Sequence, residues 1–429
     1  MKKAIRFALL LSMLAVLAVG FTACRNNDNE LVFAWWGGDF RAEQTEQVLD
    51  LFLEQNDDID YIERIVAGFG DYWDALSIRA AANDLPDVMQ NDVSRLLEYQ
   101  ESGLLVDLQP FVNDGRINLS NVPQSVVDAG RLNGELIALP IGMNVAAMVY
   151  NQSLLDSLGL EAPRNMTLDQ FINLSRQIYE LSGVRTNWAH NDPANQMEVH
   201  LRSQGVNFFE GNRLGGTVEN YVEFFEVIRR GIDEGWHVLP EHIAGREGAA
   251  QNSMWYPPGD ENAHLRTWNS PVWSNMVTGY INDSPADMVI SMTTYPSTNP
   301  LRSNFGRASM FLSMTTHSDN QDGAAALIDF WMNSMEAHEI MLGERGVIVN
   351  TQIAAALYDR LDAGPQMQSE FVGWANAGNL SPFNPTRPGG AAEVISQLND
   401  IRDLVTHGEI TPQEAAERFF AVGNEILGR

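Results

Sequence analysis

The chain has 429 residues, of which 45% are hydrophobic and 19% charged, and its formal net charge is −29. This length and composition are typical of a globular protein with two or three domains. The negative charge excludes nucleic acid as a partner, because phosphate binding needs a basic surface, and it excludes electrostatic adsorption to an anionic membrane.

The beginning of the chain has the features of an export signal. Lys2, Lys3 and Arg6 precede an apolar run over residues 7–19. This run is too short to predict a membrane-spanning helix. Lys2 and Lys3 are also the only lysines, so arginine supplies all the permanent positive side-chain charge in the rest of the chain.

Small residues follow the apolar run and lead to Cys24, the only cysteine. A cysteine at this place resembles the lipid-attachment site of bacterial lipoproteins, although Phe21 stands where that motif prefers leucine. We expect residues 1–23 to be a signal peptide and residues 24–30 to be a lipidated tether. The protein would then be exported and anchored to the outer face of the bacterial cytoplasmic membrane. The alternative is an ordinary cleaved signal with an incidental cysteine.

The first third of the chain alternates strand and helix patterns. Short apolar runs predict strands, and apolar residues that recur every three to four positions predict helices. The predicted elements are strands at 31–35, 59–66 and 87–92 and helices at 41–55, 71–84 and 93–101. Strands and helices in this order predict a mostly parallel sheet covered by helices.

The rest of the chain is more helical. The Asn133-Gly134 pair is a strong turn signal and predicts a hairpin over residues 130–140. Thr411 and Pro412 predict the start of the last helix. Further strands are predicted at 145–151, 287–292 and 308–314, and helices at 167–182, 194–204, 217–234, 320–343, 366–377, 390–406 and 411–427.

Five segments carry a family resemblance. They are FAWWGGDFRAEQ at 33–44, GFGDYWDALSIRAAANDLPDVMQND at 68–92, GLLVDLQPFV at 103–112, NGELIALPIGMNVAAMVYN at 133–151 and AAALIDFWMN at 324–333. In this order they resemble the extracellular solute-binding proteins, family 1, of carbohydrate ABC importers. The resemblance implies an α/β, two-lobed periplasmic-binding-protein-like fold, with the ligand in the cleft between the lobes and a helical carboxy-terminal segment.

The resemblance also implies how the chain is divided and what it does. The first lobe would comprise residues 31–142 and 287–345, and the second residues 143–286 and 346–429. The protein would be a monomeric receptor without catalytic activity or cofactor. It would capture an oligosaccharide by hinge closure and deliver it to the transmembrane subunits of an ABC permease.

Ligands of open parallel sheets bind at the carboxyl ends of the strands. Aromatic faces can stack on sugar rings, while carboxylates, amides and guanidinium groups can bind the hydroxyls. The first three strands end in such residues, and the AGFGDYW stretch places Phe69 on the same rim. The ligand-binding candidates from these strand ends are Trp35, Trp36, Asp39, Arg41, Trp73, Gln90 and Asp92.

Several of these candidates have a structural alternative. Neighbouring residues of a strand point to opposite faces, so we expect one of Trp35 and Trp36 to lie in the core. Asp39 can cap the following helix. Arg41 can pair with Asp39 or Glu43 at the surface.

The second lobe supplies further candidates. Residues 265–276 carry two tryptophans in a polar segment that contains proline, which disfavours burial of these rings. So many tryptophans around one cleft favour an oligosaccharide over a single sugar. The candidates from this part of the chain are Asn144, Trp188, Trp268, Trp273 and Tyr295.

Two other functions remain open alternatives. An exported glycoside hydrolase or lyase needs only a suitable pair of carboxylates, which an acidic chain supplies easily. The same fold could also bind a metal, a peptide or a polyamine. No metal site is predicted, since the histidines are scattered and His237 and His242 do not have the spacing of a helical zinc pair.

Overall fold

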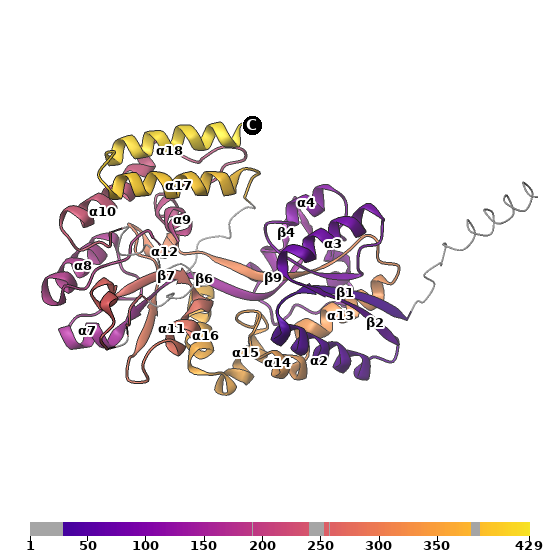
Figure 1. Cartoon of the computed structure of the whole chain (residues 1–429). Helices are drawn as coiled ribbons and strands as arrows, with labels where there is room; N and C mark the ends of the chain where they lie inside the picture. The colour runs from indigo at the N-terminus through magenta and orange to yellow at the C-terminus, as the bar shows by residue number, and fades with distance from the viewer. Residues whose placement is uncertain (1–28, 191, 240–252, 257, 379–386) are drawn as a thin grey trace, which may run out of the picture.

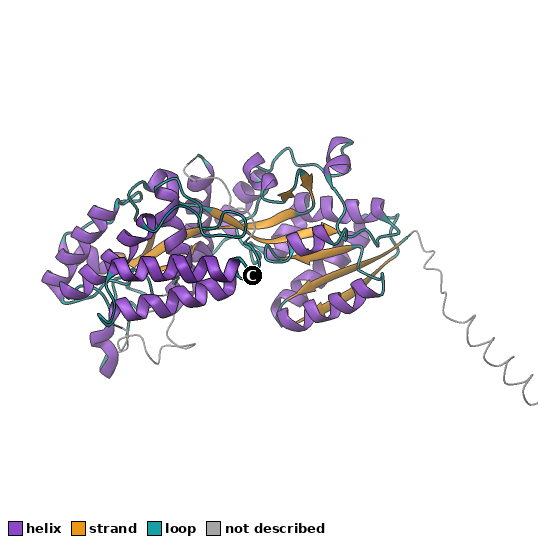
Figure 2. Ribbon diagram, turned by 90° about the horizontal axis from the view of Figure 1, so that it is seen from above, coloured by secondary structure: helices purple, strands orange, loops and turns teal. Residues whose placement is uncertain are grey.

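The computed structural model describes residues 29–190, 192–239, 253–256, 258–378 and 387–429. They form two lobes, each with strands at its centre and helices outside (Figure 1, Figure 2), which confirms the expected α/β, two-lobed architecture. The predicted signal peptide and the predicted lipid attachment at Cys24 lie outside the described residues. No helix within the described ranges is long and apolar enough to cross a membrane.

The first lobe begins with the predicted alternation of strands and helices. Its first elements are β1 (Glu30–Trp36), α2 (Asp39–Gln55), β2 (Tyr61–Ala67), α3 (Phe69–Ala81), β3 (Val88–Asn91) and α4 (Leu96–Glu101). β1 lies between β2 and β3 and pairs with both in parallel. Every residue from Leu31 to Trp35 is fully buried. A strand in this central position reads as a continuous apolar run because both of its faces are covered.

Two strands connect the lobes. β6 (Leu139–Asn151) and β9 (Gly306–Met314) run between them (Figure 1) in a sheet of order β2-β1-β3-β9-β6-β7. The first half of β6 pairs antiparallel with β9, and its second half pairs with β7 (Asn269–Trp273) and β8 (Ile290–Thr293). One strand therefore belongs to both lobes, so a rotation of one lobe against the other has to bend or twist β6.

Helices complete both lobes. α17 and α18 lie side by side along the outside of the second lobe next to α10 (Figure 1). The last helix begins as predicted, because Thr411 and Glu414 form a capping box and Pro412 stands at the first turn. The remaining helices are α5 (Gln109–Asn113), α6 (Gln124–Asp128), α7 (Gln152–Leu158), α8 (Leu168–Ser182), α9 (Pro193–Ser203), α10 (Glu219–Asp233), α11 (Val277–Asn282), α12 (Pro300–Ser303), α13 (Gln321–Asn333), α14 (Met335–Met341), α15 (Thr351–Leu357), α16 (Ala363–Asn376), α17 (Ala391–Thr406) and α18 (Pro412–Leu427).

The predicted hairpin is confirmed, but one predicted helix is wrong. β4 (Arg131–Leu132) and β5 (Glu135–Leu136) flank the Asn133-Gly134 turn, where both residues have positive φ. The helix predicted over 320–343 is broken into α13 and α14. Ser334 leaves the helical conformation, and its side chain accepts a hydrogen bond from the Ala337 N–H, so it caps the second helix.

The polar segment around the paired tryptophans contains a strand that the sequence did not predict. β7 pairs antiparallel with β6, from Ala146 opposite Trp273 to Tyr150 opposite Asn269. Pro271 has no N–H to donate, and it is tolerated because β7 is the last strand of the sheet and has a partner on one side only. Local polarity therefore does not indicate exposure here.

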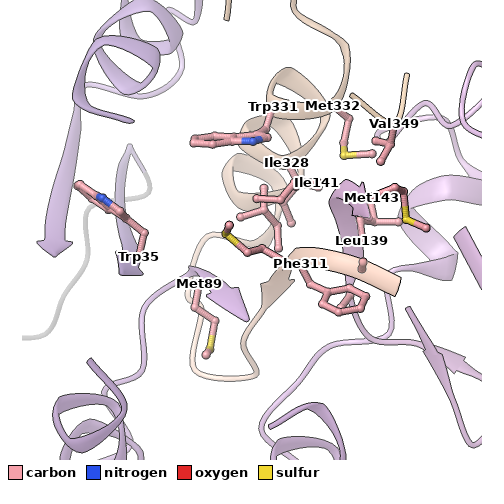
Figure 3. Packing of buried hydrophobic residues seen from close by; sticks show 14 of the residues in the cluster. Trp35, Met89, Leu139, Ile141, Met143, Phe311, Ile328, Trp331, Met332 and Val349 are labelled. Atoms are coloured by element: carbon pink, nitrogen blue, oxygen red, sulfur yellow. The ribbon is translucent and has the colours of Figure 1, made fainter. Parts of the chain in front are cut away.

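The largest core cluster joins elements that are distant in sequence. In Figure 3, Trp331 and Ile328 of α13 lie near Ile141 of β6, with Leu139, Met143 and Phe311 beyond them. Trp331 also stacks on Phe33 of β1, with 5.4 Å between ring centroids. The hydrophobic core of the first lobe is therefore formed by both early and late parts of the chain.

The first half of β6 contains a tightly packed glycine. The register of β6 against β9 shifts on both sides of Gly142. A Cβ atom at this position would lie 2.1 Å from the backbone oxygen of Arg345 and 2.5 Å from the Ser309 Oγ. Only a residue without a side chain fits between these groups.

Gly142→Ala should therefore destabilise the protein by about 1–3 kcal/mol, the usual cost of forcing an extra methyl group into a packed interior. Urea denaturation would measure the change. Gly373→Ala is the matched control, because an added methyl group in α16 meets nothing within 4 Å. Equal stability of the two variants would contradict the packing described at Gly142.

Among the histidines that the structure describes, four are largely buried. Burial lowers the pKa of His190 to about 2 and the pKa values of His200, His237 and His338 to about 4. An unfolded histidine has a pKa of about 6.5, so the unfolded state binds protons more readily than the folded state. The stabilisation from keeping these rings neutral is complete above about pH 6.5 and is lost as the pH falls towards the folded-state values.

We expect the free energy of unfolding to decrease from about pH 7 to about pH 5, by up to about 1.4 kcal/mol per pH unit for each buried histidine. Denaturation curves across this interval would measure the slope. His338→Gln should reduce it, since glutamine cannot be protonated there. His264→Gln, at an exposed position, should leave it unchanged. A stability independent of pH in this range would refute the explanation.

Candidate functional site

The carboxyl ends of three parallel strands form one rim of the first lobe. β1 and β2 stay in register up to Trp36 and Ala67, and β3 ends at Asn91 on the other side of β1. α2 and α3 start directly after the first two strands, with Gly38 and Gly68 as their N-caps. The rim predicted from the sequence is therefore present, but its side chains differ in how far they are exposed to a ligand.

An aromatic cluster, which consists of Trp36, Phe69, Trp73 and Tyr99, covers this rim. The ring centroids of Trp36 lie 5.4 Å from Phe69 and 5.7 Å from Trp73, and Trp73 lies 5.9 Å from Tyr99. Phe69 is 52% exposed, whereas Trp36 is 8% and Trp73 5% exposed. Phe69 is therefore the ring that a ligand can reach. Trp73, predicted as a ligand contact, supports the cluster from within, because its neighbours enclose the indole.

Trp35 lies in the core, as the alternation of side chains along a strand required of one member of the pair. It is fully buried, and its ring centroid lies 5.6 Å from that of Phe33. This burial disfavours the predicted contact of Trp35 with a ligand. Trp36 points to the other side of β1 and belongs to the aromatic cluster.

Arg41 is held by a carboxylate from a distant part of the chain. Its Nη2 lies 2.7 Å from Glu344 Oε1, and neither nearby acid considered from the sequence is its partner. A Cβ atom at Gly37 would lie 2.4 Å from the Arg41 Cδ, so the glycine leaves the space that this side chain occupies. Asp39 is exposed in the first turn of α2, where the N-cap position is held by Gly38.

The end of β3 supplies one accessible candidate and one buried one. Gln90 is 1% exposed, and its side-chain amide donates to the backbone oxygen of Trp36 at 3.4 Å. This bond joins β3 to β1, and the burial of Gln90 disfavours its predicted contact with a ligand. Asp92 is partly exposed, and its Oδ1 accepts from the Ser94 N–H at 2.9 Å and from the Ser94 hydroxyl at 2.6 Å.

Two of the tryptophans predicted in the second lobe lie in its core. Trp188 is 1% exposed and packs between Phe171 and Phe224. Trp268 is fully buried, and its Nε1 donates to the Thr186 Oγ1 at 2.7 Å. Packing from other helices and strands encloses both rings, which disfavours the predicted contacts with a ligand.

Tyr295 and Asn144 are also buried and already hydrogen-bonded. The Tyr295 hydroxyl donates to the Val272 backbone oxygen at 3.1 Å, and burial raises the pKa of Tyr295 well above its usual value. Asn144 is 5% exposed and accepts from the Gln368 side-chain amide at 3.0 Å. Their burial and hydrogen bonds give both residues structural roles near the junction of the lobes and disfavour the predicted contacts with a ligand.

Trp273 is the predicted tryptophan of the second lobe that stays partly exposed. It ends β7, and the Arg307 guanidinium lies over its ring at 4.1 Å from the centroid. Phe305 meets the same ring edge-on at 5.6 Å. Arg307 stands opposite Asn144 in the β6–β9 ladder, so the Trp273–Arg307 pair lies where the chain passes from one lobe to the other.

Charges from both lobes act on Arg307. Arg307 keeps part of its surface open to solvent. Neighbouring protein atoms nevertheless shield it from much of the water, and this loss of solvation is the largest cause that lowers its pKa. The carboxylates of Asp92 in the first lobe and Asp192 in the second raise the pKa of Arg307, and the positive charge of Arg387 lowers it. Arg387 itself donates to the Asn195 Oδ1 at 3.3 Å. We call Asp92, Asp192, Trp273, Arg307 and Arg387 the junction site.

Sequence reasoning missed three of these five residues. Arg307 stands at the start of an apolar strand, Asp192 precedes a helix as an ordinary cap, and Arg387 lies in a loop. Nothing in the local pattern distinguishes them from other surface charges. The one available signal is that no lysine follows Lys3. A binding site that needs a permanent positive charge must therefore use arginine, so arginines near predicted strand ends are candidates.

Other parts of the surface fit a sugar or a metal less well. A polar depression near the amino end of α13 is lined by residues such as Asn56, Asp58, Asp319 and Asp322, and none of the described residues that line it is aromatic. It therefore lacks a surface on which sugar rings stack. Within the described ranges, no group of three His, Cys, Asp or Glu residues is placed to hold a metal ion.

Known proteins resemble this chain in sequence and in fold. The melibiose/raffinose/stachyose-binding protein MelE of Bacillus subtilis (strain 168) is 24% identical over 181 residues, which is 41% of this chain and 40% of that protein. The matched part is thus less than half the length of this relative.

Solved structures also share the fold, and two of them illustrate the similarity. An extracellular solute-binding protein of family 1 from Alicyclobacillus acidocaldarius has a TM-score of 0.79 and 21% identity, with coverage of 93% of this chain and 98% of that one. A periplasmic oligogalacturonide-binding protein from Yersinia enterocolitica has a TM-score of 0.77 and 21% identity, with coverage of 93% and 99%.

The family itself follows from the sequence. The family model described as bacterial extracellular solute-binding protein matches residues 47–368, which include most elements of both lobes. This match confirms the family resemblance, and it includes four of the five segments that carried it, all except residues 33–44. The chain belongs to the bacterial extracellular solute-binding protein family.

Proposed function

We propose that this protein is the substrate-binding component of an ABC importer and that it captures an extracellular oligosaccharide between its lobes. The observation that carries the proposal is the junction site. There a partly exposed tryptophan, a guanidinium group stacked on it and two carboxylates meet where the lobes join. Sugar rings need an apolar face and paired hydrogen-bonding groups, and this set offers both.

The aromatic cluster extends the same surface on the side of the first lobe. Phe69 presents an exposed ring at the start of α3, and the buried indoles of Trp36 and Trp73 hold it in place. A ring supported in this way loses little conformational entropy on binding. Two separate aromatic surfaces, at Phe69 and at Trp273, suit a ligand of more than one sugar ring.

Closure of the lobes would provide the working motion. β6 and β9 are continuous between the lobes, so bending them brings the two aromatic surfaces together without breaking either core. A ligand that contacts both lobes favours the closed form in proportion to its extra contacts there. The permease would then distinguish closed from open receptors by the relative position of the lobes.

The remaining parts of the proposal concern location and partners. The protein acts outside the cytoplasm as a monomer, held at the membrane by a lipid on Cys24, and delivers its ligand to the transmembrane subunits of the permease. The support for the anchor is the position of the single cysteine after an apolar run. The support for the permease partner is membership of the family.

The non-sugar and enzymatic alternatives predict different behaviour. A polyamine would need unopposed carboxylates, but the positive charge of Arg307 acts on both Asp92 and Asp192, and that of Arg387 acts on Asp192. A glycoside hydrolase would release shorter saccharides from an oligosaccharide. The receptor proposal requires the saccharide to be recovered unchanged.

Calorimetry against a panel of neutral and acidic oligosaccharides should find a ligand that binds more tightly than about 1 mM, which is roughly −4 kcal/mol. Trp273→Ala should weaken that binding by about 1–3 kcal/mol because apolar contact with the ring is lost. Tyr61→Ala is the control, since this exposed ring stands at the opposite end of β2 from the rim.

Two results would count against the receptor proposal. Absence of binding to every saccharide in the panel would remove the assignment to sugars. Release of shorter products at a catalytic rate during the same incubations would favour the hydrolase or lyase instead.

Phe69→Ala should mainly affect saccharide binding, and Trp73→Ala should mainly affect stability. Phe69→Ala should weaken saccharide binding about fivefold or more while it changes stability by less than about 1 kcal/mol. Trp73→Ala should lower the free energy of unfolding by about 3–5 kcal/mol, since a buried indole leaves a cavity. Urea denaturation and calorimetry on both variants would separate the effects. Normal stability with lost binding in Trp73→Ala would restore the prediction from the sequence that Trp73 contacts the ligand.

A further inference from the structure

Arg307 differs from most arginines of this chain in lacking a carboxylate partner. Arginines such as Arg41, Arg116 and Arg229 are tied to acids by ion pairs. In the part of the chain that the structure describes, no ion pair joins Arg307 to a carboxylate, and its guanidinium lies over the Trp273 ring instead. One flat face is therefore covered, while the edge that carries the N–H donors stays available.

The nearby carboxylates are engaged elsewhere. Asp92 accepts two hydrogen bonds from Ser94. Asp192 accepts hydrogen bonds from both the backbone and the side chain of Asn195, as the cap of α9. Both acids therefore act on Arg307 through their charge, but neither takes up its donors.

A second cation stands near Arg307. Arg387 lies close enough that its charge disfavours the charged form of Arg307, and its one hydrogen bond in the described part of the chain goes to a neutral amide, that of Asn195. Two like charges at one site repel each other unless an anion lies between them. The charges of Asp92 and Asp192 partly offset this repulsion, and a carboxylate of the ligand would offset it further, which a neutral sugar cannot do.

The negative net charge of the whole protein strengthens the argument from these two arginines. The formal net charge of −29 repels anions at long range. A receptor with such a surface can hold an anionic ligand only if cations are placed at the binding site itself. Guanidinium groups suit this role because their fork matches a carboxylate in two parallel hydrogen bonds.

We propose that the saccharide is acidic, with uronate units, and that the Arg307 guanidinium binds a uronate carboxylate at the junction site. Arg387 supplies a second positive charge to the same carboxylate or to the next one along the ligand. The inference rests on the proposed capture of a saccharide and adds the chemical class of that saccharide.

The test uses pairs of oligosaccharides that differ only in charge. Oligomers of galacturonate, of mannuronate and guluronate, and of glucuronate are each compared with their carboxyl-reduced forms, which keep the rings and linkages but carry a neutral hydroxymethyl group. Calorimetry measures the affinity of the purified protein for both members of each pair. Fluorescence and denaturation curves check that every variant is folded.

Three variants identify the residue responsible. Arg307→Gln removes the charge, Arg307→Lys keeps the charge without the fork, and Arg302→Gln is the matched control, since Arg302 is an exposed arginine on α12. We expect at least one uronate oligomer to bind tenfold or more tightly than its reduced form. Arg307→Gln should abolish that preference with a loss of roughly 10- to 100-fold in affinity, whereas Arg302→Gln should retain it.

The outcomes separate this inference from the proposed function. If the reduced forms bind as tightly as the uronates, or if Arg307→Gln weakens both equally, the acidic ligand is overturned while saccharide capture stands. If neither form of any pair binds, both proposals fail. An intermediate preference in Arg307→Lys would support a contribution of charge and fork together, and full wild-type affinity for the uronate in Arg307→Gln would overturn the role of Arg307.

Discussion

The antiparallel ladder between β6 and β9 is the constraint on which both lobes depend. β6 spends its first half in the sheet of the first lobe and its second half between β7 and β8 of the second. Its residues from Leu139 to Tyr150 are all buried, so the strand cannot shift its register without exposing one core or the other. The lobes can therefore rotate about the ladder but cannot exchange or separate.

This ladder also explains where the chemistry lies. Arg307 lies at the beginning of β9, where this strand passes out of the second lobe. Asp92 directly follows β3, and it lies next to the same strand because Asn91 pairs with Phe311. Trp273 ends β7, which pairs with the far half of β6. Charges and rings from separate parts of the chain thus meet at the junction because the strands that carry them share one sheet.

Local patterns predicted the strands and helices of the first lobe well, because alternation and capping depend on neighbouring residues. The candidate site was predicted less well. Trp188 and Trp268 are enclosed by elements far away in sequence, and no local signal reveals that enclosure. Arg307 was missed for the converse reason, since it stands beside apolar strand residues but keeps an exposed side chain. Burial of large aromatic rings is a property of the whole fold.

The stacking of Trp331 on Phe33 has a consequence for how the chain folds. These rings complete the first lobe, yet one comes from its first strand and the other from α13, which follows the middle segment of the chain that belongs to the second lobe. The amino-terminal strands are made early but cannot close their interior until β9 and α13 have been synthesised. Contacts of such large sequence separation form slowly, because the entropy of closing the long loop has to be overcome first. The first lobe therefore has to wait for α13, and the second lobe, whose core includes residues of α17 and α18, has to wait for the end of the chain.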